Sequence, residues 1–119
     1  MDTADLLERS YPGRRAELKR DIFRKALSLF NEQGIEATTI EMIRAECDTS
    51  VGAIYHHFGN KEGLVAALFF TALEDQACLR DAYLDAANTT EEGVQALVFS
   101  YVDWVEQQPQ WARFQYHAR

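Results

Sequence analysis

The sequence has few of the residues that break or cross-link a chain, and each shortage excludes a class of protein. Two prolines and six glycines in 119 residues exclude collagen-like and low-complexity chains, and 47% hydrophobic residues are typical of a folded globular domain. The two cysteines, Cys47 and Cys78, form no CxxC motif and are too few for a disulfide framework. We therefore expect a folded protein in a reducing compartment and predict a cytoplasmic location.

Long hydrophobic runs are also missing. The longest, residues 65–73, is interrupted by Thr71 and is about half as long as the roughly twenty residues that a membrane-spanning helix needs. The first ten residues carry acidic side chains and no apolar core of a secretion signal. We therefore predict no membrane partner.

The net charge of −7 disfavours nucleic acid as a partner of the whole chain, but the charges are unevenly distributed. Residues 1–61 hold 9 Lys/Arg and 10 Asp/Glu, a net charge of −1, whereas residues 62–119 hold 3 and 9, a net charge of −6. This asymmetry indicates two regions with different roles, and any contact with DNA must be local to the first.

What the sequence does contain is helical periodicity throughout, which predicts an all-α fold. A first helix follows the break at Pro12-Gly13, ends at Gly34, and has an apolar stripe at i, i+4, i+8, i+11 and i+12. This stripe is formed by Leu18, Ile22, Ala26, Leu29 and Phe30.

Further helices are indicated by their start signals. A capping box, Thr38 to Glu41, opens a second helix, and Ser50 caps a short third helix that ends at Gly59. Asn60 can cap a long fourth helix, which follows over about 61–87. A second capping box at Thr89 opens a fifth helix, and Pro109 starts a sixth.

The second and third helices, joined by a short turn, are typical of a helix-turn-helix whose second helix can enter the major groove of DNA. Ile54 and Phe58 face inward on that helix, and Gly52 allows close backbone approach to a phosphate. Lys61 opposes the dipole of the next helix, which a nearby phosphate would explain. The side chains left outside are Ser50, Val51, Ala53, Tyr55, His56 and His57.

Residues 26–64 resemble the DNA-binding region of TetR-family transcriptional regulators. The family pattern runs AxxLFxxxG, TTxxxIA, GVSxGxLYxHF and xKxxL. The positions that match it are Ala26, Leu29, Phe30, Gly34, Thr38, Thr39, Ile43, Ser50, Gly52, Ile54, Tyr55, His57, Phe58, Lys61 and Leu64. The ending PQWARFQYHAR resembles the short sixth helix of the family's effector domain.

The resemblance implies a role for each matched residue. Thr38 and Thr39 would bind phosphate through hydroxyl and backbone N–H groups, and three further side chains would contact the DNA backbone without specifying sequence. These three are Tyr55, His57 and Lys61. On the side that faces the groove, Val51 and Ala53 would offer apolar contact and His56 a hydrogen bond to a base edge.

Three positions in this region depart from the pattern, and one of them is Thr49, which stands where the family has valine. Arg44 stands where the family has alanine and either offers DNA an extra cation or pairs with nearby Glu41 or Glu46. Asp48 stands where the family has glycine, and we expect it to adopt the left-handed conformation of that glycine.

The resemblance implies a helix-turn-helix domain over residues 1–60, in which residues 1–13 form a flexible N-terminal arm. Residues 61–119 would be the first part of a helical effector-binding domain. Family members continue through helices that close the ligand pocket and build the dimer interface, so we expect the 119 residues to be a fragment, since Trp111, Phe114 and Tyr116 would otherwise lack partners.

The predicted function is a ligand-responsive regulator that represses transcription as a homodimer on a palindromic operator and is released by a small molecule. Weak candidates for lining the ligand cavity are Phe69, Leu73, Tyr101 and Trp104, although each such residue is more often core. No catalytic constellation or phosphate loop stands at a recognisable spacing, and His56-His57 lacks a third metal ligand, so we predict no enzyme, cofactor or metal. The alternative is a helical protein-interaction or nucleoid-associated module.

Overall fold

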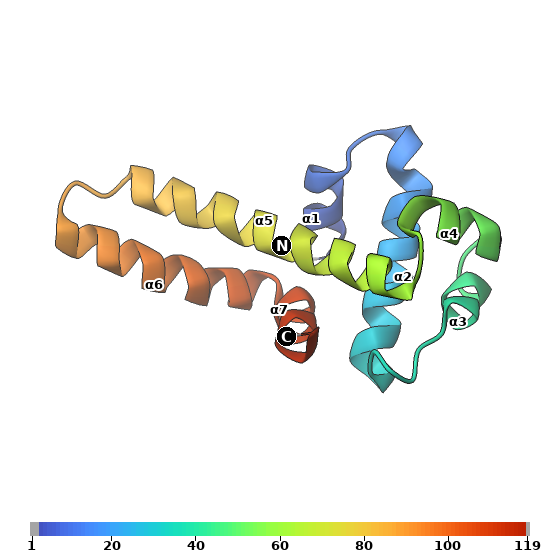
Figure 1. Ribbon diagram of the computed structural model, residues 1–119. Coiled ribbons are helices and arrows are strands. Elements are labelled where there is room, and N and C mark those ends of the chain that lie inside the picture. Colours follow the sequence, from blue (N-terminus) through green and yellow to red (C-terminus); the bar gives the residue numbers. More distant parts are fainter. Residues whose placement is uncertain (1–2, 119) are drawn as a thin grey trace.

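The computed structural model describes residues 3–118, and the side chains of residues 6–118, as helices joined by short turns (Figure 1). No strand occurs within these residues, which confirms the all-α prediction. In chain order the elements are α1 (Thr3–Ser10), a 3₁₀ helix η1 (Arg14–Ala16), α2 (Glu17–Gln33), α3 (Ile40–Ala45), α4 (Val51–Phe58), α5 (Lys61–Asp85), α6 (Thr90–Gln107) and α7 (Pro109–Ala118).

The molecule is elongated, with principal extents of 52 × 30 × 22 Å. Helices α2, α3 and α4 gather at one end, while α5 runs away from them and α6 returns antiparallel to α5 (Figure 1). We call the first group the helix-turn-helix domain and the pair α5–α6 the hairpin. Because α5 starts directly after α4 and spans the hairpin, one helix connects both regions.

The flexible arm predicted for residues 1–13 is wrong for the part that the structure describes. Residues 3–10 form α1, and the side chains of Leu6 and Leu7 are fully buried between α1 and its neighbours. Burying two leucines stabilises this segment by roughly 3–6 kcal/mol, which offsets the entropy cost of ordering it. Residues 1–2 lie outside the described residues.

Side-chain caps start four of the helices. The side chains of Thr39, Ser50, Asn60 and Thr89 each accept a hydrogen bond from a backbone N–H in the first turn that follows. Three of these caps were predicted from the sequence, but the cap of α3 is Thr39, not Thr38. The predicted start of the sixth helix at Pro109 is confirmed.

The predicted stripe of α2 is confirmed at its centre and is wider than expected. Ile22, Ala26 and Phe30 are buried as predicted, and Phe23 and Leu27 are buried beside them. The stripe is wider because α2 packs on more than one side: it contacts α3 on one face and α1 and α7 on others. A helix surrounded on several sides buries more than one narrow face.

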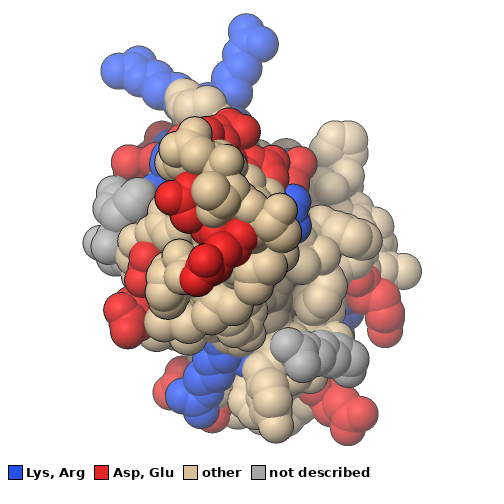
Figure 2. Space-filling model, turned by 90° about the vertical axis from the view of Figure 1, so that its left-hand side faces the viewer, with Lys and Arg blue, Asp and Glu red and all other residues tan. Residues whose placement is uncertain are grey.

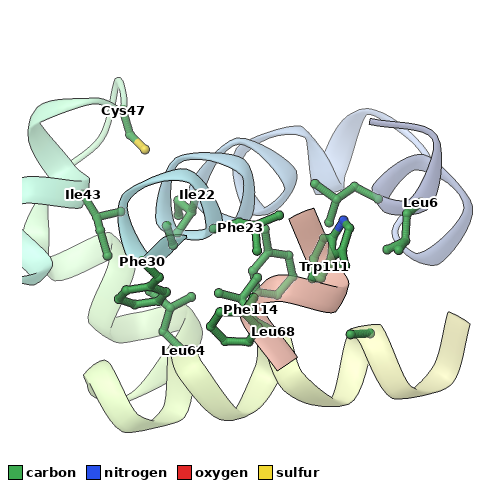
Figure 3. Close-up of a cluster of buried hydrophobic side chains, with 14 of the residues drawn as sticks. Leu6, Ile22, Phe23, Phe30, Ile43, Cys47, Leu64, Leu68, Trp111 and Phe114 are labelled. Atoms are coloured by element: carbon green, nitrogen blue, oxygen red, sulfur yellow. The ribbon is translucent and has the colours of Figure 1, made fainter. Parts of the chain in front are cut away.

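Helix α7 folds back from the hairpin onto the helix-turn-helix domain. Its Trp111 and Phe114 are fully buried, and the Phe114 ring stacks on Phe30 of α2 with ring centroids 5.9 Å apart. Figure 3 shows both side chains pointing into the space between α2 and α5. The expectation that these two aromatic side chains lack partners in the chain is therefore wrong.

The hairpin buries only a narrow stripe. In α6 the buried residues are Ala96, Ser100 and Trp104, spaced four apart, and the rest of the helix is largely exposed. Several of its exposed side chains are apolar: Val94, Leu97, Val98, Phe99, Tyr101 and Val102. Within the described residues, no helix is both long enough and apolar enough to cross a membrane.

Candidate nucleic-acid interface

Helices α3 and α4 form the predicted helix-turn-helix, and two glycines fit α4 closely to α5. Gly59 adopts a positive φ of 82°, a conformation that favours glycine, and its N–H caps α4 by bonding to the carbonyl oxygen of Tyr55. Gly63 lies in the first turn of α5, where an added Cβ would overlap the carbonyl oxygen of Phe58. This close approach could not be predicted from the sequence, because a glycine inside a helix carries no signal of its neighbour.

The turn between α3 and α4 is built without a left-handed residue. Within residues 3–118 no residue other than glycine has a positive φ, so the left-handed conformation expected for Asp48 is wrong. Cys47 anchors this turn from inside with only 9% of its surface exposed. Burial and the neighbouring Asp21 carboxylate raise the pKa of the Cys47 thiol to about 11, so it is a protonated apolar residue at neutral pH.

Helix α4 presents one fully buried residue and an otherwise open surface. Ile54 is buried against the domain core, and Phe58 is half-buried with its ring 5.2 Å from that of Phe23. Tyr55, with 45% of its surface exposed, lies on the open side of the helix. The other predicted site residues of α4 divide into exposed Gly52, His56 and His57 and half-buried Val51 and Ala53.

Thr38 does not belong to the open surface. Its side chain is fully buried, its hydroxyl donates to the carbonyl oxygen of Gly34 at 2.8 Å, and its backbone N–H donates to Ile35. The same hydroxyl oxygen accepts from the amide of Gln33 at 3.1 Å. The predicted phosphate contact of Thr38 is therefore wrong, because both of its polar groups hold the α2–α3 loop in place.

Thr39 and Ser50 lie on the open surface at the first residues before α3 and α4. Each side-chain oxygen accepts a backbone N–H of its own helix, from Met42 at 3.2 Å and Ala53 at 3.1 Å. A capping hydroxyl uses a lone pair and keeps its proton, so both can still donate to an anion. Caps and phosphate contacts are thus compatible at these two positions.

Lys61 is the first residue of α5 and is half-buried. Its Nζ donates to the carbonyl oxygen of Glu36 at 3.3 Å, which holds the side chain against the α2–α3 loop. An ammonium group has three protons, so two remain for an anion. A cation at this helix start is unfavourable by itself, and an anionic partner would remove that penalty.

Arg44 pairs within its own helix. Its Nε donates to the Glu41 carboxylate at 3.0 Å, and this bond holds the pKa of Glu41 below its usual range and that of Arg44 above its own. Of the two alternatives that the sequence left open for Arg44, the structure shows the ion pair with Glu41.

The acidic excess lies away from this surface. Figure 2 views the molecule from the tip of the hairpin and shows carboxylates gathered around that end. The exposed acids of the tip include Asp81, Asp85, Glu91 and Glu92. Their separation from α4 reduces the repulsion that a DNA backbone at the helix-turn-helix would experience, because salt screens charges over about 8–10 Å.

The four weak candidates for a ligand cavity do not face one space. Trp104 is 1% exposed and donates its indole N–H to Asp75, whereas Leu73 and Tyr101 are exposed. Phe69 lines a groove of about 430 Å³ between α5 and α7, whose other apolar walls are Ile35, Val65, Ala66, Phe70 and Ala118. Among the described residues, no three His, Cys, Asp or Glu side chains gather where they could hold a metal ion.

A comparison with known families identifies this arrangement. Residues 22–68, from the middle of α2 to the first turns of α5, match the family model described as bacterial regulatory proteins, tetR family. The chain carries a TetR-family helix-turn-helix domain. This assignment confirms the family resemblance of residues 26–64, and the matched segment contains α3, α4 and the start of the connecting helix α5.

The chain is also similar to curated proteins, and each match covers more residues than the family model does. The chain is 32% identical over 89 residues to the transposon Tn10 TetC protein of Escherichia coli, covering 72% of this chain and 43% of that protein. It is 45% identical over 49 residues to the uncharacterized HTH-type transcriptional regulator YerO of Bacillus subtilis, covering 41% and 17%. It is 41% identical over 59 residues to the HTH-type transcriptional repressor AcnR of Corynebacterium glutamicum, covering 50% and 30%. These matches thus span less than half the length of each relative.

Proposed function

We propose that this chain supplies the DNA-binding domain and connecting hairpin of a ligand-responsive repressor that binds a palindromic operator as a homodimer. The observation that carries the proposal is the open surface of α4, which presents polar and aromatic side chains beside Lys61 in a TetR-family helix-turn-helix. A relative of similar sequence is named as a transcriptional repressor.

In this proposal phosphate contacts position the domain. Thr39 and Ser50 donate their free hydroxyl protons, Lys61 donates its two remaining N–H groups, and Tyr55 and His57 contact the same backbone from α4. Gly52 lets the start of α4 approach a phosphate closely. These contacts fix the register of α4 in the groove and carry no sequence information.

Base readout falls to His56, Val51 and Ala53. The exposed imidazole of His56 can donate to or accept from a base edge, and the two apolar residues can contact a thymine methyl group. Three side chains can discriminate only a few base pairs. Useful specificity then requires two copies on two half-sites about one turn, roughly 34–36 Å, apart.

The experiment is selection of duplexes from a random-sequence library by the 119-residue chain, followed by sedimentation of the complex. We expect an inverted repeat occupied by two chains. Tyr55→Phe should lower affinity about equally on all sequences, and His56→Ala should change which sequences are enriched. Enrichment of no sequence, or tight binding of one chain to a half-site, would contradict the proposal.

Release by a small apolar molecule is the second part of the proposal. It is supported by α5, which begins at the DNA-binding surface and continues through the hairpin, so that its tilt would move α4. An effector that prefers the tilted geometry shifts the population by its differential affinity, typically about 1–3 kcal/mol. Affinities for DNA and effector must then change by the same factor in both directions. An effector that binds equally well with and without DNA would contradict this part.

A further inference from the structure

The N-terminal helix α1 and the residues that follow it, 3–13, lie across the junction between the helix-turn-helix domain and the hairpin. We call residues 3–13 the N-terminal strap. Helix α1 packs on both α2 and α5 (Figure 1), and Figure 3 shows Leu6 close to Trp111 of α7. The strap therefore contacts elements of both regions at the point where they could bend.

On the side of the helix-turn-helix domain, the strap is held by Tyr11 and by Arg20 of α2. Nη1 of Arg20 donates hydrogen bonds to the carbonyl oxygens of Tyr11 and Gly13, at 2.6 and 2.7 Å. The Tyr11 ring lies 5.3 Å from that of Phe23, and the Nζ of Lys19 lies 4.2 Å above the Tyr11 ring. These contacts fix the end of the strap to α2.

The same Tyr11 reaches across to the connecting helix α5. Its hydroxyl oxygen is 2.7 Å from that of Thr71, and the Thr71 hydroxyl donates its single proton to the carbonyl oxygen of Ala67. Tyr11 is therefore the donor to Thr71, which is itself buried. One tyrosine thus connects α2 and α5.

One carboxylate makes the next connection, to both helices of the hairpin. Asp75 of α5 has a side chain only 11% exposed, and its two oxygens accept from different elements. Oδ1 accepts from Nη2 of Arg9 in α1 at 2.9 Å, and Oδ2 accepts from the indole Nε1 of Trp104 in α6 at 3.0 Å. Because the group is largely desolvated, it needs these partners, and loss of either leaves a buried polar group unsatisfied.

We propose that Asp75 is a positioning residue: its carboxylate joins the N-terminal strap to α6 and so fixes the angle between the hairpin and the helix-turn-helix domain. A shift of α6 against α5 moves Trp104, and through Asp75 and Arg9 it moves the strap that is bonded to α2. The role is geometric and rests on contacts within the chain. Only its consequence for DNA affinity rests on the proposed function.

The direct test measures the distance between the two regions in the full 119-residue chain. Spin labels are placed on Ala45→Cys in α3 and Asn88→Cys at the tip of the hairpin, with Cys78 replaced by serine, while buried Cys47 stays unlabelled. Asp75→Asn retains the side-chain shape and removes the charge bonded to Arg9. Asp85→Asn, an exposed carboxylate on the same helix, is the matched control.

We expect a single narrow distance distribution in the labelled parent and in Asp85→Asn, and a distribution about twice as broad or shifted in mean in Asp75→Asn. A folded Asp75→Asn, judged by its helical circular dichroism, with the parent's distribution would overturn the proposal. Should Asp75→Asn fail to fold, the milder variants Arg9→Gln and Trp104→Phe, which leave the carboxylate in place, decide by the same criterion.

A second measurement uses the fact that Arg9 and Trp104 are bonded to opposite oxygens of the same group. Each of Arg9→Gln and Trp104→Phe should raise the unfolding equilibrium constant about fivefold to tenfold, and the double variant by less than the product. In the Asp75→Asn background the two effects should multiply. If the effects of Arg9→Gln and Trp104→Phe on the unfolding equilibrium constant multiply in the parent, the two residues do not act through a shared carboxylate, which contradicts the proposal.

The DNA measurement separates this proposal from the proposed function. With the duplex selected by the parent chain as probe, Asp75→Asn should bind about tenfold more weakly and Asp85→Asn unchanged. If the parent selects no duplex, the proposed function fails while the distance measurement still decides the role of Asp75. If the distance distribution of Asp75→Asn broadens and its DNA affinity stays at the parent's value, Asp75 fixes the angle between the two regions but does not affect DNA binding. That result would contradict the proposed consequence for DNA affinity.

Discussion

The helix-turn-helix domain and the hairpin handle their apolar residues in opposite ways. In the first region Ile22, Phe23, Ile43 and Ile54 are fully buried in a core to which α1, α5 and α7 also contribute. In the hairpin, α6 exposes 58% of Val94 and 56% of Phe99 to solvent. Monomeric domains rarely expose a contiguous apolar face of this kind without a partner for it. The first region thus buries its large apolar side chains within the chain, whereas α6 leaves a face of them exposed.

The two regions also differ in what their polar side chains do. In the helix-turn-helix domain, polar side chains cap helices and line the open surface around α4, and buried apolar side chains hold the helices together. The hairpin has a thin interior and is tied to the domain through α7 and the N-terminal strap. Substitutions matched between the two regions should therefore have unequal effects.

The largest contrast is expected between a buried and an exposed apolar side chain. Phe114→Ala removes the ring that stacks on Phe30 at the junction and should lower the free energy of unfolding by about 3–5 kcal/mol. Val98→Ala on α6, 54% exposed, should change it by less than about 0.5 kcal/mol. Urea unfolding followed by circular dichroism measures both. Equal losses would show that the face of α6 is already covered in solution.

The two cysteines should differ in chemical reactivity, because one is buried and the other is exposed. The pKa of the Cys47 thiol in the helix-turn-helix domain is raised to about 11, so at pH 8 its thiolate fraction is about a hundredfold lower than at the ordinary thiol pKa. Cys78 in the hairpin is exposed. Iodoacetamide at pH 8 should therefore modify Cys78 alone, and Cys47 should react only as the pH approaches 11 or the chain unfolds. Mass spectrometry of the digested protein assigns the modified residue. Equal rates at pH 8 would mean that the domain opens readily.

Substituting alanine for two helical glycines should change the free energy of unfolding in opposite directions. Gly63→Ala places a Cβ against the carbonyl oxygen of Phe58 and should destabilise by about 1–3 kcal/mol, because backbone must shift. Gly93→Ala in α6 meets no atom within 4 Å and should stabilise by about 0.8–1 kcal/mol through helix propensity. Thermal melts of the two variants test the pair. A neutral Gly63→Ala would mean that α4 and α5 are less tightly apposed than described.

The smallest effect is expected at an ion pair within one helix. Arg44→Ala removes only the exposed bond to Glu41 and should leave the melting temperature unchanged within error. Tyr83→Phe removes a hydroxyl that donates to Asp103 at 2.5 Å and links α5 to α6, so its melting temperature should fall more. The reverse order would show that Arg44 has a role beyond its pairing with Glu41.

Sequence reasoning predicted the helix-turn-helix domain more fully than its connections. Helix periodicity, caps and Pro109 report on neighbours within a few residues, so the all-α fold and the starts of α4, α5, α6 and α7 were predictable. The strap was missed because Leu6 and Leu7 gain their burial from residues far along the chain. Burial of Thr38 and the carboxylate joint at Asp75 depend on such distant neighbours too.

The most direct test is the salt dependence of DNA affinity in two variants of α5, one at its start beside α4 and one toward the tip of the hairpin. The central claim is that DNA phosphates are neutralised at the surface formed by α4 and the first residue of α5, and not along the rest of the hairpin. With the duplex selected by the parent chain, Lys61→Ala should weaken binding at every salt concentration and reduce the slope of log K against log salt by about one. Arg80→Ala, which removes a hairpin cation paired with Asp81, should leave slope and affinity unchanged. An unchanged slope for Lys61→Ala, or a reduced slope for Arg80→Ala, would contradict the claim.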